Sequence, residues 1–219
     1  MSKSEIKKSL DLTEKWGLES LKALKAVKSK QLMYGVVHGA LHKDLRIESA
    51  KFTDKYFEAI AIGGIYGTRA DMYQIIDWVI PNVSDEKVRH LLGIGEVEDL
   101  FNGVERGIDL FDCVAPTRRA RNGSIYISYT NGGTSANHFS LNILSAKYKM
   151  DKNSLDPGCF CYTCQNFTRA YLCHLFLAKE LLYHNLATIH NVYFILNLMK
   201  KMREAIKLGS FSKLKEKWL

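Results

Sequence analysis

The sequence predicts an α/β fold built on a parallel sheet, because short apolar runs alternate with helical segments along its first half. The runs end at glycine or at a polar residue, and the segments between them carry apolar residues at helical spacing. Strands that alternate with helices in this way form βα units and a parallel sheet. The runs are LMYGVVH (32–38), AIAIGG (59–64), HLLGIG (90–95) and IDLFDCV (108–114).

Four βα units in series leave two architectures open, a doubly wound sheet or part of a barrel. No GxGxxG motif follows the first run, which argues against a dinucleotide-binding fold. Apolar periodicity predicts a first helix over residues 4–29. The predicted helices between the runs are 42–57, 70–80 and 96–107.

The pattern changes after residue 114. SIYISY (124–129) and the Gly-Gly that follows it predict a hairpin-like excursion. Two helical stretches then follow, about 165–183 and 187–206. We expect two parts, 1–123 with the βα units and 124–219 with the hairpin and the later helices.

The composition indicates a globular protein with a basic surface. The chain has 219 residues, 47% of them hydrophobic, and a net charge of +8. Part of the excess lies in TRRAR (117–121) and in the C-terminal segment, so a nucleic acid is a candidate partner, although a solvated basic surface is the simpler interpretation. No apolar run reaches the about 18 residues of a membrane span, and the charged N-terminus has no apolar signal segment. We expect a cytoplasmic protein with reduced thiols and no membrane partner.

The segment CFCYTC (159–164) holds three of the five cysteines and predicts a zinc site. Zn²⁺ takes four tetrahedral ligands, and a structural site takes all four from the protein. We choose His190 as the fourth ligand, because a helix that doubles back after residues 184–188 would begin near the cluster. The residues that could supply this ligand are Cys113, Cys173, His174, His184 and His190. One structural zinc held by Cys159, Cys161, Cys164 and His190 is the expected cofactor.

Three segments resemble the C-terminal half of the tRNA-guanine transglycosylase (queuine tRNA-ribosyltransferase) family. They are GVERGIDLFDCVAPTRRARNG (103–123), CFCYTCQNFTRAYL (159–172) and LATIHNVYFILNLMKKMREAI (186–206). The resemblance implies the C-terminal half of a (β/α)8 TIM-type barrel with an inserted zinc-binding subdomain and C-terminal helices. It also implies the same four zinc ligands. The activity it implies is exchange of guanine at wobble position 34 of tRNA for a 7-deazaguanine, preQ1 or queuine.

The resemblance implies that Asp112, in the FDC motif, is the catalytic nucleophile. A carboxylate can attack C1′ of a ribose and hold it covalently until the incoming base displaces it, as in retaining glycosidases. Asp109 is a rival on the residues alone. The two aspartates point to opposite faces of a strand, and Asp112 lies nearer its carboxyl end.

The resemblance also implies residues that bind the base and the tRNA. Gly63, Gly64 and Leu92 match the base pocket, and His38 stands where the family usually has glutamine. An imidazole can both donate and accept when neutral, so His38 bears on substrate choice. Two stretches match tRNA-contacting segments: Gly93, Ile94, Gly95, Glu96, Val97, Glu98 and Asp99, and then Thr117, Arg118, Arg119, Ala120 and Arg121.

The chain does not resemble the first four barrel strands of the family, which carry an acid/base aspartate and part of the base pocket. We therefore expect a homo-oligomer or a separate chain that supplies the other half, because a half-barrel exposes two sheet edges and an apolar face. A split enzyme, a truncated remnant and a late-assigned start are the alternatives. The competing function is a non-catalytic, zinc-stabilised tRNA-binding subunit.

Overall fold

The computed structural model describes residues 2–65 and 67–219, which form two compact units. The first unit runs to Gly95 and resumes over Asp99–Cys113. The second comprises Glu96–Glu98 and Val114–Leu219. These compact units divide after Cys113. The boundary between domains that the sequence predicts at residue 123 is a separate statement and remains a prediction.

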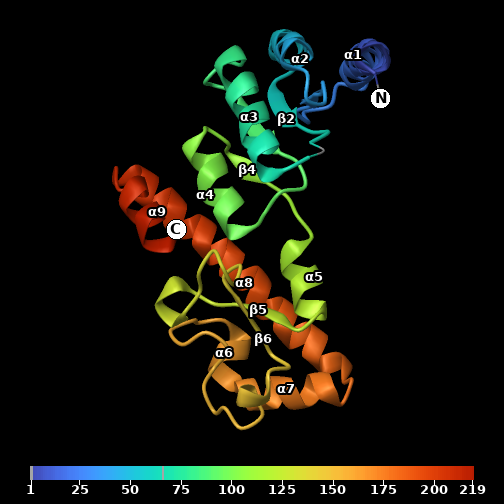
Figure 1. The fold of residues 1–219 in the computed structure, drawn as a ribbon. Coiled ribbons are helices and arrows are strands. Elements are labelled where there is room, and N and C mark those ends of the chain that lie inside the picture. Colours follow the sequence, from blue (N-terminus) through green and yellow to red (C-terminus); the bar gives the residue numbers. More distant parts are fainter. Residues whose placement is uncertain (1, 66) are drawn as a thin grey trace. The chain divides into compact units, whose positions relative to one another are not determined.

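The first unit contains a four-stranded parallel sheet in the order β1-β2-β3-β4. Its strands are β1 (Tyr34–Val37), β2 (Ala59–Ile62), β3 (Val88–Leu91) and β4 (Leu110–Phe111). Strands β2 and β4 are labelled in Figure 1. The predicted α/β class is therefore confirmed. A doubly wound sheet reverses its strand order at a switch point, whereas this sheet adds each strand in sequence, as a β/α barrel does.

The helices of the first unit lie close to their predicted positions. They are α1 (Lys3–Ala26), α2 (Lys43–Tyr56), α3 (Arg69–Val79), α4 (Val97–Glu105) and the short 3-10 helix η1 (Ile80–Asn82). Two of them begin at capping boxes. Ser2 and Glu5 exchange hydrogen bonds at the start of α1, and Thr68 and Asp71 do so at the start of α3.

The two faces of the sheet have different surroundings. One face packs against helices α2 and α3 through Val37, Ile60, Ile62 and Leu91, which form a core with Ala50, Met72, Ile75, Ile76 and Val79. The other face carries the alternate residues. Of these, Tyr34, Val88 and Leu110 are 36%, 39% and 44% exposed. An exposed apolar face of this kind is what another layer of structure covers in a complete α/β fold.

The second unit combines a short antiparallel ribbon with helices. Strands β5 (Ser124–Tyr126) and β6 (Ser140–Asn142) pair in antiparallel fashion, which bears out the predicted hairpin-like excursion. The helices are α5 (Ala115–Arg121), α6 (Tyr162–Asn166), α7 (Arg169–Leu177), α8 (Leu181–Lys207) and α9 (Phe211–Trp218). Two 3-10 turns, η2 (Tyr129–Asn131) and η3 (Ala146–Tyr148), lie between β5 and α6.

The basic stretch 117–121 lies in helix α5, whose first turn accommodates Pro116 because a proline needs no hydrogen-bond acceptor there. Two sequence-based expectations for this unit are corrected. The chain is expected to turn back after residues 184–188, but α8 is continuous over Leu181–Lys207. The single helix expected over 165–183 is interrupted. The side chain of Thr168 accepts a hydrogen bond from Tyr171 N and starts α7 as a new helix.

Helix α8 organises the second unit. It contacts α5, α6, α7, α9 and β5. Its buried residues Tyr183, Leu186 and Ala187 join a core with Ile125, Ile143, Leu155 and Leu172. Among the residues that the structure describes, no helix has the length and apolar character needed to cross a membrane.

Candidate functional site

The register of the sheet brings four predicted site residues into one row at the carboxyl ends of the strands. The row before it consists of Val36, Ala61, His90 and Leu110, which pair across the four strands. Side chains two residues apart on a strand lie on the same face, so the next row, at the carboxyl ends, is formed by positions 38, 63, 92 and 112. These positions hold His38, Gly63, Leu92 and Asp112.

Three of these residues meet around Gly63. A Cβ atom on Gly63 would lie 3.2 Å from Leu92 Cδ1, 3.2 Å from Val36 Cγ1 and 3.6 Å from His38 Cε1. A larger residue would crowd these side chains, so glycine leaves the backbone open between them. A cavity of about 620 Å³ adjoins this point, lined by His38, Gly64 and residues of α1.

His38 is held in its neutral form. Its backbone N–H donates to Ser49 Oγ at 3.1 Å. Burial and the positive charge of Arg46 both lower the pKa of its imidazole below the usual value of 6.5. At neutral pH the ring therefore offers one donor and one acceptor to a ligand.

Arg46 joins the ends of β1 and β2, although no motif in the sequence marks it. The side chain is fully buried and donates to four carbonyl oxygens: Ala40 at 2.9 Å, Val37 at 3.0 Å, Gly63 at 2.7 Å and Gly64 at 2.8 Å. Burial lowers its pKa to about 10. One signal was available, because Arg46 stands at helical spacing from Ser49 and Ala50 on the inward side of α2.

Asp112 and Asp109 have different surroundings. Asp112 follows β4, and its side chain is 60% exposed. Its Oδ1 accepts a hydrogen bond from Gly93 N at 3.2 Å and lies 3.0 Å from His90 Nε2. Asp109 instead joins two strands, because its Oδ2 accepts from Arg89 N at 2.9 Å and its own N–H donates to Arg89 O.

The predicted RNA-contacting stretch 93–99 is only partly accessible. Gly95 lies against Cys113, whose sulfur a Cβ atom at position 95 would overlap. Val97 is buried. Asp99 is also buried, and it accepts a hydrogen bond from the Tyr73 hydroxyl at 2.9 Å and pairs with Arg69 at 2.7 Å.

The basic residues of helix α5 divide into two groups. Arg119 forms a bidentate ion pair with Glu96, with Nε 3.2 Å from Oε1 and Nη2 2.7 Å from Oε2. Its guanidinium lies over the Tyr126 ring. Ala120 is buried, and its carbonyl accepts from the Tyr183 hydroxyl. Arg118 and Arg121 are exposed.

The second unit brings together four potential metal ligands. The sulfur atoms of Cys159, Cys161 and Cys164 lie 3.8, 3.5 and 3.3 Å from His190 Nδ1. All four ligand atoms lie within 4.8 Å of one another, so the group can hold one metal ion.

Neighbouring contacts fix the orientation of His190. Its Nε2 lies 2.8 Å from Tyr126 O, so this nitrogen donates the proton and Nδ1 is left to face the sulfur atoms. The next residue, Asn191, is fully buried. It accepts from Tyr126 N and donates to Pro116 O and Ser124 O, each at 3.0 Å. No motif in the sequence marks Asn191 as part of this site.

The thiols of the cluster perturb one another. Contacts with Cys159 and Cys164 lower the pKa of Cys161, whereas contacts with Cys159 and Cys161 raise the pKa of Cys164. Burial lowers the pKa of His190, but hydrogen bonds with Cys159 and Cys161 raise it more, to about 9. Three adjacent thiolates repel one another, and a divalent cation removes that repulsion.

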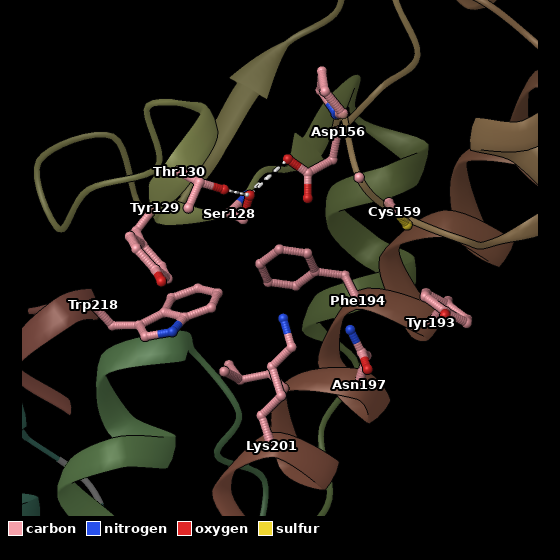
Figure 2. A pocket seen from close by; sticks show the side chains of 13 residues that line it. Ser128, Tyr129, Thr130, Asp156, Cys159, Tyr193, Phe194, Asn197, Lys201 and Trp218 are labelled. Atoms are coloured by element: carbon pink, nitrogen blue, oxygen red, sulfur yellow. Dashed lines mark hydrogen bonds between the residues drawn. The ribbon is translucent and has the colours of Figure 1, made fainter. Parts of the chain in front are cut away.

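A pocket of about 170 Å³ adjoins the cluster (Figure 2). Tyr129, Phe194 and Trp218 supply aromatic walls, and Lys201 extends toward it from α8. Asp156 accepts hydrogen bonds from the backbone and hydroxyl of Ser128, and the Asp156 carbonyl accepts from Cys159 N. These bonds secure the loop that carries the first cysteine.

The parallel sheet and the Cys3His group define an α/β protein with a metal-ligand site. A family model described as queuine tRNA-ribosyltransferase matches residues 1–219. A putative queuine tRNA-ribosyltransferase of Archaeoglobus fulgidus is 47% identical over 97% of this chain and 52% of the relative. Queuine tRNA-ribosyltransferases of Caldanaerobacter subterraneus and Neisseria gonorrhoeae are 45% and 40% identical, each matched over 55% of its length.

The chain belongs to the queuine tRNA-ribosyltransferase family. It spans about half the length of the curated relatives it matches.

The Arg46→Met substitution is expected to destabilise the first unit by about 3 kcal/mol, because it leaves four carbonyls without their donor. Chemical denaturation measures the loss. The matched control is Lys51→Met, an exposed position on the same helix, which should change stability by less than about 0.5 kcal/mol. Equal stability of the two variants would contradict the role given to Arg46.

Proposed function

We propose that this chain is the catalytic half of a tRNA-guanine transglycosylase, which replaces guanine at wobble position 34 of tRNA by a 7-deazaguanine, preQ1 or queuine. The observation that carries the proposal is the row of His38, Gly63, Leu92 and Asp112 at the carboxyl ends of the strands, in a chain of this family. Parallel α/β folds bind substrates at that end of the sheet.

Asp112 acts as the nucleophile in this proposal. One of its oxygens bonds to C1′ of the ribose as the bond from C1′ to N9 of guanine breaks. Guanine leaves with that electron pair and takes up a proton. The incoming base loses its N9 proton, bonds to C1′ and releases the carboxylate. Asp109 is less suited to this role, because it lies before β4, whereas Asp112 follows the strand at the carboxyl end of the sheet.

The base lies against the open backbone at Gly63 and Gly64 and packs on Leu92. Neutral His38 supplies one donor and one acceptor to its edge. The Arg46 hydrogen bonds to both glycine carbonyls support this arrangement, because they hold the peptides in place. In the family the acid/base aspartate belongs to the first four barrel strands. We propose that those strands come from a separate chain or segment and complete the (β/α)8 barrel.

The metal is zinc in this proposal, held by Cys159, Cys161, Cys164 and His190. Tetrahedral bonds of about 2.3 Å to sulfur and 2.0–2.1 Å to nitrogen place a sulfur and a nitrogen roughly 3.5 Å apart. The observed separations from His190 Nδ1 are 3.3–3.8 Å, so the residues fit such an ion. Four protein ligands leave no open position, and the ion stabilises the second unit rather than taking part in chemistry.

In this proposal Arg118 and Arg121 supply tRNA contacts from the second unit. Of the arginines in α5, these two are exposed, whereas Arg119 is engaged with Glu96. Exposed guanidinium groups bind phosphates and base edges of an anticodon loop.

The first test is incorporation of labelled guanine into a tRNA with G at position 34. The 219-residue chain is assayed alone and with the part of the Archaeoglobus relative that lies outside the match. We expect Asp112→Ala to lower exchange by roughly a thousandfold, because the nucleophile is lost. Asp109→Asn should retain exchange, because an amide oxygen still accepts from Arg89 N.

Two results would count against this function. Exchange that survives Asp112→Ala and is lost in Asp109→Asn would transfer the nucleophile to Asp109. A folded, metal-loaded chain that binds tRNA but exchanges nothing in either arrangement would favour the non-catalytic tRNA-binding subunit.

The double variant Arg118→Ala/Arg121→Ala should weaken tRNA binding about tenfold. It should also reduce the slope of log K against log salt by roughly one to two, because phosphate contacts are lost. Binding titrations at several salt concentrations measure both. The matched control, Lys149→Ala/Lys152→Ala, removes two exposed charges elsewhere in the second unit. An equal loss in the control would show that only net charge matters.

Purified protein should contain about one zinc per chain by elemental analysis. Cys161→Ser should lose the metal and unfold the second unit, because such sites contribute on the order of 10 kcal/mol to folding. Cys173→Ala, which changes a buried cysteine outside the cluster, should keep the metal. Wild-type protein that stays folded after zinc is chelated would refute the structural role.

A further inference from the structure

His90 is the feature of the first unit that the proposed function leaves unused. It lies on β3, in the row directly before the row that contains Asp112, and on the same face of the sheet. Its side chain is 21% exposed. Its ring packs edge-on against Tyr34, with 5.7 Å between the ring centroids.

Two nitrogen atoms converge on one oxygen of Asp112. Gly93 N donates to Oδ1 at 3.2 Å, and His90 Nε2 lies 3.0 Å from the same atom. Nε2 is buried and makes no aligned hydrogen bond with any residue that the structure describes. The 3.0 Å separation from Oδ1 suits a hydrogen bond, which a rotation of the exposed carboxylate would have to align.

The other carboxylate oxygen is left available. Among the described residues, no hydrogen bond or ion pair involves Asp112 Oδ2. If Oδ1 accepts from both Gly93 and His90, the carboxylate presents its second oxygen in a defined direction, which an attack on a single carbon atom requires.

We propose that His90 is a positioning residue that holds Oδ1 of Asp112 and directs Oδ2 toward the ribose. The proposal rests on the proposed role of Asp112 as nucleophile. A neutral imidazole with its proton on Nε2 suits this task. It donates one hydrogen bond to Oδ1 without placing a full positive charge beside the carboxylate that must attack.

The contact is tested first by spectroscopy, independently of catalysis. Long-range ¹H–¹⁵N correlation spectra report which imidazole nitrogen carries the proton, and His90→Phe identifies the His90 signals. We expect the Nε2–H tautomer in the wild type and a shift of the Nε2 signal by several ppm in Asp112→Ala. A His90 spectrum that does not change in Asp112→Ala overturns the proposal.

Kinetics tests the consequence. The assay contains the part of the Archaeoglobus relative that lies outside the match. In it, His90→Phe should lower the maximal exchange rate about tenfold and leave KM for tRNA unchanged, because a hydrogen bond to a charged group is lost. His90→Gln restores a donor and should recover part of the rate. Tyr34→Phe keeps the neighbouring ring and should match the wild type.

The outcomes separate this proposal from the proposed function. An unchanged rate in His90→Phe, or a rise in KM alone, overturns the positioning role of His90 and leaves the proposed transglycosylase function unaffected. If the His90 signal responds to Asp112→Ala but the chain never exchanges guanine, the contact between the two side chains is supported. The proposed transglycosylase function is then contradicted.

Discussion

The parallel register of β1 to β4 is the constraint on which the first unit depends. Because Val36, Ala61, His90 and Leu110 share one row, the residues two positions later share the next row on the same face. A slip of one residue in any strand would turn its site residue toward helices α2 and α3. The core on the helix-covered face opposes such a slip, because it would expose Val37, Ile62 or Leu91.

A buried charge completes this end of the sheet. Arg46 has no carboxylate partner among its hydrogen bonds, and carbonyl oxygens from both loops take the place of water around its guanidinium. Removing a charge from water is costly unless its donors are satisfied, so the two loops must keep the positions that satisfy it. The same charge helps to keep His38 neutral. One side chain, Arg46, thus both holds these loops in place and lowers the pKa of His38 in the candidate base site.

The second unit depends on a comparable arrangement around α8. His190 faces the three cysteines through Nδ1 and the Tyr126 carbonyl through Nε2, while Asn191 bonds to backbone groups at 116, 124 and 126. Two consecutive residues of one helix therefore join the cysteine loop, strand β5 and helix α5. A cation that offsets the repulsion between the thiolates would stabilise all three segments together.

Local patterns in the sequence are enough to predict the βα alternation, the cluster of three cysteines and the position of Asp112 after its strand. These depend on periodicity and spacing, which are visible along the chain, whereas His190 is one of several candidates for the fourth ligand. The helix at 115–121, the break before Arg169 and the contacts of Arg46, His90 and Asn191 are visible only in the structure. Each of the three side chains contacts groups that lie far along the chain, up to 75 residues away for Asn191. Periodicity can place such a residue on a face, but only the packed strands and helices decide which distant carbonyl or carboxylate it meets.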